Sequence, residues 1–86
     1  MSNEALDETV AKLKSERDEL RVRMHLAKME IKDEYEVLEK KWFELEQKLE
    51  EVGKATKESA GEVKSAAGIL AQEIGTAYKH VRKSMD

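Results

Sequence analysis

The sequence predicts an all-α protein, an antiparallel helical hairpin with a long first helix. Three observations support this fold class. Apolar residues recur at steps of three and four over most of the chain, which is the period of a helix with one apolar face. The 86 residues include no proline and only four glycines. Charged residues make up 41% of the chain, and a Glu/Lys/Leu/Ala-rich composition with this spacing is typical of long, coiled-coil-like helices.

The first helix is expected over residues 4–52 of a single domain, residues 1–86. Its acidic first turn is placed favourably against the positive end of the helix dipole, with Ser2 or Asn3 as the N-cap. Neither glycine nor proline interrupts the apolar stripe after it, so this stripe requires another helix to cover it. The core of the stripe is Leu20, Met24, Ala27, Ile31, Tyr35, Leu38, Trp42, Leu45, Leu49 and Val52.

Two features depart from a simple stripe. Arg17 occupies a core position, where it either extends out of the seam towards solvent or fixes the register of the helices as a polar core residue. Val22, Leu26 and Met29 form a second apolar row on the opposite face, and a helix that is apolar on two sides is usually buried on two sides. The eleven-residue spacing from Met24 to Tyr35 predicts local unwinding of a supercoil.

The turn is expected at about residues 53–58 and the second helix at about 59–84. Gly53 follows the first stripe directly and fits a left-handed helix C-cap. Ser59 and Glu62 have the spacing of a capping box, although Thr56 is a competing N-cap. The second helix carries its own three-four stripe, which matches the first stripe in antiparallel register. The predicted intrachain packing residues are Tyr35, Leu38, Trp42, Leu45, Leu49, Val63, Ala67, Leu70, Ile74 and Val81.

Three glycines recur every seven residues in the second helix, at Gly61, Gly68 and Gly75. Glycine within a helix costs about 1 kcal/mol relative to alanine. The repeat therefore indicates close approach of another backbone, or else simply a weak helix.

The two expected helices differ in length, since 1.5 Å per residue gives roughly 70 Å for the first and roughly 40 Å for the second. The second helix is too short to cover the amino-terminal part of the first, so we expect a homodimer or higher homo-oligomer assembled as a helical bundle. The predicted oligomer interface is Leu6, Val10, Leu13, Leu20, Val22, Met24, Leu26 and Met29.

No pattern in the sequence predicts catalysis, a cofactor or a metal site. His25 and His80 lack a second histidine or a cysteine at metal-ligand spacing, and no glycine-rich phosphate loop is present. We expect a non-enzymatic structural or protein-interaction module. The absence of cysteine and of an apolar leader favours a cytoplasmic protein.

Charge is distributed unevenly along the chain, with a net charge of −5 over residues 1–52 and +2 over residues 53–86. This balance does not favour nucleic acid as a partner. The basic turn at residues 79–83 follows the apolar segment 66–71, which suggests an alternative function as a lipid-binding helix on an anionic membrane surface. Cations at a helix end also complement the helix dipole and an acidic neighbouring helix, and this second interpretation is the one we favour.

A charged first helix carrying the stretch Glu39-Lys40-Lys41-Trp42 precedes a second helix rich in alanine and glycine. In this pattern the chain resembles small uncharacterised bacterial coiled-coil proteins and, more broadly, the amphipathic helices of apolipoproteins. The resemblance covers most of the length and implies a helical fold, but it implies no activity and no site residues.

Overall fold

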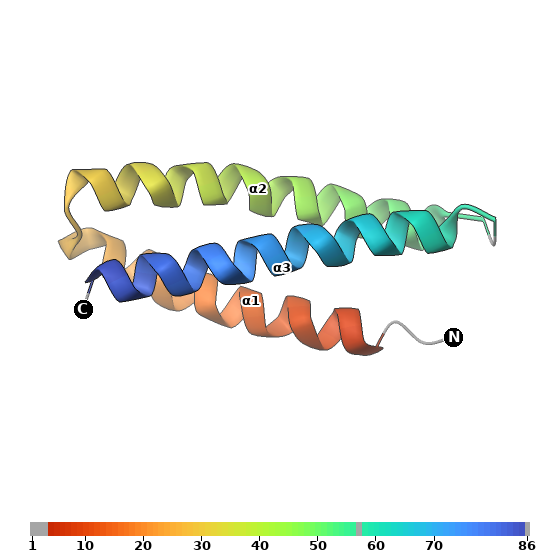
Figure 1. The fold of residues 1–86 in the computed structure, drawn as a ribbon, viewed down its shortest axis with the longest axis horizontal. Coiled ribbons are helices and arrows are strands. Elements are labelled where there is room, and N and C mark those ends of the chain that lie inside the picture. Colours follow the sequence, from red (N-terminus) through yellow and green to blue (C-terminus); the bar gives the residue numbers. More distant parts are fainter. Residues whose placement is uncertain (1–3, 57, 86) are drawn as a thin grey trace.

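The computed structural model describes residues 4–56 and 58–85, and this part of the chain forms a bundle of three helices. The helices are α1 (Glu4–Arg23), α2 (Met29–Lys54) and α3 (Ala60–Met85). A single 3-10 turn, η1 (Met24–Leu26), follows α1. All three helices lie side by side along the long axis of the molecule (Figure 1). The all-α fold class predicted from the sequence is thus confirmed.

The prediction of one continuous first helix over residues 4–52 is wrong. The backbone becomes extended at Ala27 (φ −82°, ψ 155°) and Lys28 (φ −68°, ψ 155°), and the chain then reverses direction. We refer to residues 24–28, which separate α1 from α2, as the corner. Figure 1 shows α1 lying alongside α3 instead of extending α2. The longest dimension of the Cα trace is 45 Å, well short of the roughly 70 Å that an unbroken helix would need.

Burial of apolar side chains on α1 and in the corner explains why the chain reverses there. Leu13, Leu20 and Met24 are only 3%, 0% and 9% exposed in the folded chain. Removing a large apolar side chain from water contributes about 1.5–3 kcal/mol. This gain outweighs the few helical hydrogen bonds lost at the corner, each of which contributes a net 0.5–1.5 kcal/mol or so. The expectation that the amino-terminal apolar row has no partner within the chain is therefore wrong.

Contacts between side chains establish the helix directions. Arg82 Nη2 of α3 lies 4.0 Å from Glu16 Oε2 and 3.8 Å from Glu19 Oε2 of α1. Closer to the amino ends of both helices, Leu13 Cδ2 lies 3.4 Å from the point that a Cβ would occupy at Gly75. Residue numbers rise together along both helices, so α1 and α3 run parallel, and α2 runs antiparallel to them in an up-down-up bundle (Figure 1).

The core runs the length of the bundle and draws on all three helices. Seven of the ten residues predicted for intrachain packing are buried: Tyr35, Leu38, Trp42, Leu45, Ala67, Ile74 and Val81. Leu49 and Leu70 are partly buried and pack against this core, and Val63 is half-buried. The core also includes Leu13, Leu20, Met24, Ala71 and Tyr78. Packing of α1 therefore completes a core that α2 and α3 alone would leave open.

The connection between α2 and α3 differs from the prediction in its details. The helix α2 continues through Gly53 to Lys54, and no glycine of the described chain has a positive φ, so the predicted left-handed cap at Gly53 is wrong. The Thr56 carbonyl accepts hydrogen bonds from the amides of Ser59 and Ala60, which starts α3 one residue after the predicted position. Ser2 and Asn3, the predicted N-caps of the first helix, and Lys57 in the turn lie outside the described residues.

The parallel packing of α1 and α3 accounts for only one of the three glycines in the repeat, Gly75. A Cβ added at Gly61 or at Gly68 would meet nothing within 4 Å, so the predicted close backbone approach is wrong at both positions. Because Gly75 lies opposite Leu13, Gly68 corresponds to Leu6, near the start of α1. Gly61 lies beyond the first residue of that helix. Only Gly75 has a neighbour, and that neighbour is a side chain rather than a backbone.

Candidate interaction site

A partly buried polar cluster joins α1 to α2. The Arg17 guanidinium donates two hydrogen bonds to the Glu39 carboxylate, from Nε to Oε1 at 2.8 Å and from Nη2 to Oε2 at 2.7 Å. The Arg17 Cζ also lies 5.4 Å from the centre of the Trp42 ring, within range of a cation–π contact. Forked pairs of this type fix both distance and orientation. The geometry therefore matches the interpretation of Arg17 as a register-fixing core residue and not as a side chain extending to solvent.

Two tyrosines complete the cluster. The Tyr35 hydroxyl donates to the Arg17 carbonyl oxygen at 3.2 Å, whereas the buried Tyr78 hydroxyl has no hydrogen-bond partner within the described chain. Burial raises the pKa of both tyrosines above the ordinary value. Hydrogen bonding to Arg17 holds the pKa of Glu39 below its usual range. Both phenols therefore keep their protons and Glu39 keeps its charge at neutral pH, as expected of a cluster that stabilises the fold.

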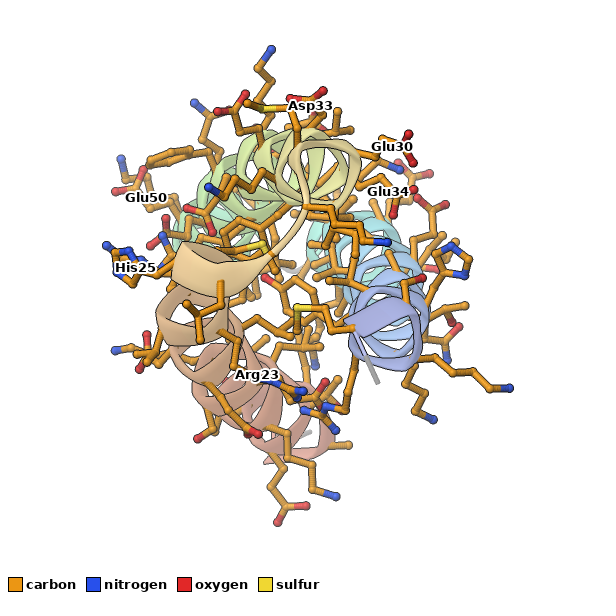
Figure 2. The ribbon with its side chains drawn as sticks, turned by 90° about the vertical axis from the view of Figure 1, so that its left-hand side faces the viewer. Arg23, His25, Glu30, Asp33, Glu34 and Glu50 are labelled. Atoms are coloured by element: carbon orange, nitrogen blue, oxygen red, sulfur yellow. The ribbon has the colours of Figure 1, made fainter. Side chains whose placement is uncertain are left out.

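The corner presents a different surface. Leu26 is 95% exposed, and Val22 and Met29 beside it in the chain are 71% and 70% exposed. No other large apolar side chain of the described residues is exposed to this degree. Figure 2 views the bundle from this end, with the ribbon of the corner in front and His25 pointing away from the bundle. We call Val22, Leu26 and Met29 the corner patch.

A groove of about 330 Å³ opens at the same end of the bundle, between the corner and the last turn of α3. Its walls combine apolar side chains from both elements with cationic side chains in or next to the corner. The lining residues are Arg23, Leu26, Ala27, Lys28, Ile31, Ser84 and Met85. The side chains of residues 4–56 and 58–85 therefore leave a groove at this end of the bundle.

Basic residues lie beside the corner patch, and acidic residues flank them. Asp18 lines a hollow together with Val22 and His25, and Figure 2 shows Glu30, Asp33 and Glu34 at the same end of the bundle. Residues 20–29 contain no acidic residue but include exposed Arg21, His25 and Lys28. Residues 74–85 of α3 also contain no acidic residue, and this segment ends at the same end of the bundle (Figure 1). Arg82 of that segment lies within 4.0 Å of acidic side chains of α1, in agreement with the interpretation that these cations complement an acidic helix.

The structure divides the predicted oligomer interface into three groups. Leu13, Leu20 and Met24 are buried in the chain's own core. Leu6 and Val10 are partly buried against that core. Only the corner patch remains exposed. Sequence reasoning missed Glu39, because a residue 22 positions from Arg17 has no spacing signal that would pair the two.

Metal-ligating side chains are dispersed over the described part of the chain. Among the described residues, no group of three or more His, Cys, Asp or Glu side chains could hold a metal ion. His25 and His80 are both exposed, on different elements. None of the helices in the described ranges combines the length and the hydrophobicity needed to cross a lipid bilayer.

Comparison of the chain with models of known families, with curated proteins and with solved structures gives no match. The resemblance to small bacterial coiled-coil proteins therefore stays a prediction.

Proposed function

We propose that the chain is a non-enzymatic structural or protein-interaction module that self-associates through its helices. The observation that supports this proposal is the open end of the bundle, where Leu26 is 95% exposed at the edge of an unfilled groove. The amino-terminal row no longer supports it, because Leu13 and Leu20 are buried within the chain. The contact between copies is instead assigned to the corner and its surroundings.

Exposure of this kind is unfavourable in an isolated bundle. Single apolar side chains on a protein surface are common, whereas larger exposed apolar patches mark interaction sites. Val22, Leu26 and Met29 supply three strongly exposed apolar side chains within eight residues of the chain. Each large apolar side chain of the corner patch would gain up to about 1.5–3 kcal/mol on full burial. The patch therefore favours association with another apolar surface, and a second copy of the chain always supplies one.

A second candidate function is binding to an anionic membrane surface. It is supported by exposed Arg21 and Lys28 beside the exposed apolar side chains of the corner patch, since this combination suits the boundary between lipid headgroups and acyl chains. Pelleting with vesicles of phosphatidylcholine alone and with vesicles that also contain phosphatidylserine tests it. Salt-sensitive binding to the anionic vesicles would support the membrane function, and absence of binding to both would contradict it.

Sedimentation equilibrium between about 1 and 200 μM protein tests self-association directly. We expect a mass that rises with concentration towards twice the chain mass of 9.9 kDa. A folded protein that keeps the mass of one chain at every concentration would contradict the proposal. Far-UV circular dichroism on the same samples establishes that the helices are intact.

A further inference from the structure

We infer that two copies of this chain associate by exchanging α1: in each copy α1 and α2 join into one continuous helix, and α1 docks on α2 and α3 of the partner subunit. The inference rests on the proposed self-association and specifies its mechanism. Exchange of a whole element is a low-cost route to a dimer, because the contacts already formed within one chain are formed again between two.

The corner has the sequence of a helix although it is not one. Residues 24–29 read Met-His-Leu-Ala-Lys-Met and contain no glycine or proline. Alanine, leucine, methionine and lysine are among the best helix formers. Only Ala27 and Lys28, each with ψ 155°, have extended backbone in the corner. The helical break is therefore imposed by packing of α1 within the chain, and docking of α1 elsewhere would remove its cause.

The register of the bundle is compatible with exchange. Arg17 of α1 faces Glu39 of α2, and the midpoint between these two residues is residue 28, inside the corner. In two continuous antiparallel helices, Arg17 of each would lie opposite Glu39 of the other. Residue 28 of one helix would then lie opposite residue 28 of its partner, so the two helices would cross at their corners. Every contact between α1 and α2 then forms between subunits with the same partners, on both sides of a two-fold axis.

The open end of the bundle would be covered in the exchanged dimer. Ala27 and Ile31 are only partly buried and line the groove beside Met85. Ala27 and Ile31 lie within four residues of the crossing point at residue 28. In the exchanged dimer they would therefore face the corresponding apolar residues of the partner's helix. Leu26, now 95% exposed, would lie one helical turn from Val22 and from Met29 or Glu30 and would be partly covered by them.

Lys28→Pro is the decisive variant, because it fits the closed corner and breaks the continuous helix. The Lys28 φ of −68° is the proline value, and Ala27 before it has the extended backbone that a following proline favours. The backbone bonds of the described corner are donated by the amides of Ala27, Ile31 and Lys32, so none of them is lost. In a continuous helix the same proline would remove a hydrogen bond and clash with the preceding turn.

The experiment compares the wild type, Lys28→Pro and Lys28→Ala by sedimentation equilibrium. Lys28→Ala removes the same charge but keeps helix propensity, so it is the matched control. We expect dimers for the wild type and for Lys28→Ala, and a folded monomer for Lys28→Pro with a dimer dissociation constant raised at least a hundredfold. Equal dimerisation of Lys28→Pro and wild type would overturn the inference while leaving the proposed self-association intact. A monomeric wild type would overturn both.

Charge reversal across the Arg17–Glu39 pair gives an independent test. In Arg17→Glu and in Glu39→Arg, like charges face each other within each chain. If α1 is exchanged, a heterodimer of the two variants forms one reversed pair and one original pair between its subunits. We expect unfolding and refolding of the two together to give a species of two-chain mass with a melting temperature above that of either variant alone.

The double variant Arg17→Glu/Glu39→Arg controls for the reversed pair within one chain. A mixture no more stable than its separate components, with a stable double variant, would overturn the exchange. A dimer that is lost on replacing Val22, Leu26 and Met29 by glutamine, and that is unaffected by Lys28→Pro, would show instead that closed bundles meet through their corner patches.

Discussion

Replacing Glu39 by glutamine tests whether the Arg17–Glu39 pair stabilises the fold of the single chain. The change keeps the size of the side chain and one acceptor oxygen, but it removes the negative charge that receives both guanidinium hydrogen bonds at 2.8 and 2.7 Å. The amide of the substituted side chain presents N–H groups where Arg17 requires an acceptor. One of the two bonds is therefore lost and the other is weakened.

The expected loss of stability follows from the geometry and exposure of the pair. A hydrogen bond to a charged group contributes about 1.5–3 kcal/mol when it is well buried. The side chains of Arg17 and Glu39 are 16% and 25% exposed, so water screens part of this interaction. We expect Glu39→Gln to lower the free energy of unfolding by about 1–2 kcal/mol, a decrease of about 4–16 °C in melting temperature for a domain of this size.

The effect of this substitution should depend on pH. Because Arg17 lowers the pKa of Glu39 in the folded state, the pair contributes fully above the ordinary carboxyl pKa of about 4.3. The contribution is lost as pH falls through the lower pKa of the folded state, where Glu39 becomes protonated. The wild type should therefore lose stability relative to Glu39→Gln on acidification, and the two proteins should converge as Glu39 becomes protonated.

Urea unfolding followed by circular dichroism, at low micromolar protein and at several pH values, measures this difference. A double-mutant cycle with Arg17→Met isolates the coupling between the two side chains. A stability difference below about 0.3 kcal/mol at pH 7, or one that does not decrease as pH falls below the ordinary carboxyl pKa, would refute the reasoning.

Three further predictions concern the helices and the core. Gly68→Ala should raise the free energy of unfolding by about 0.5–1 kcal/mol, because a Cβ there meets nothing within 4 Å, and Gly75→Ala should raise it less; a larger gain at Gly75 in thermal melts would contradict the packing of α1 on α3. Tyr35→Phe should cost about 0.5–1.5 kcal/mol through its lost hydrogen bond, whereas Tyr78→Phe should be neutral or stabilising, since that buried hydroxyl has no partner in the described chain; urea titrations that reverse this order would show the assignment to be wrong. Leu20→Ala should cost about 2–5 kcal/mol because Leu20 is fully buried, and a cost below 1 kcal/mol in the same titrations would mean that α1 does not pack as described.

Much of the fold could be predicted from local patterns. Spacing of apolar residues predicted helices over most of α1, α2 and α3, and it named the faces of α2 and α3 that carry Leu38, Trp42 and Ile74 into the core. These predictions succeed because the helical period and the identity of buried residues are properties of short segments. The all-α class likewise follows from a composition without proline and with few glycines.

The site was less predictable, because its residues come from segments far apart in the chain. Arg17 was recognised as an exception in an apolar stripe, yet its partner Glu39 was one of many acidic residues on a charged helix. Val22, Leu26 and Met29 were predicted to form a second apolar row on one continuous helix, but α1 ends at Arg23 and the three side chains are exposed. Neither property is encoded by spacing within one helix.

By itself, the sequence determined that helices form, which of their faces are apolar and where the α2–α3 connection lies. Only the tertiary structure decided that the chain reverses at Ala27 and Lys28, where the local sequence favours a helix. The physical reason is that local preference within a few residues amounts to fractions of a kcal/mol per residue, whereas burying Leu13, Leu20 and Met24 against the rest of the chain contributes several.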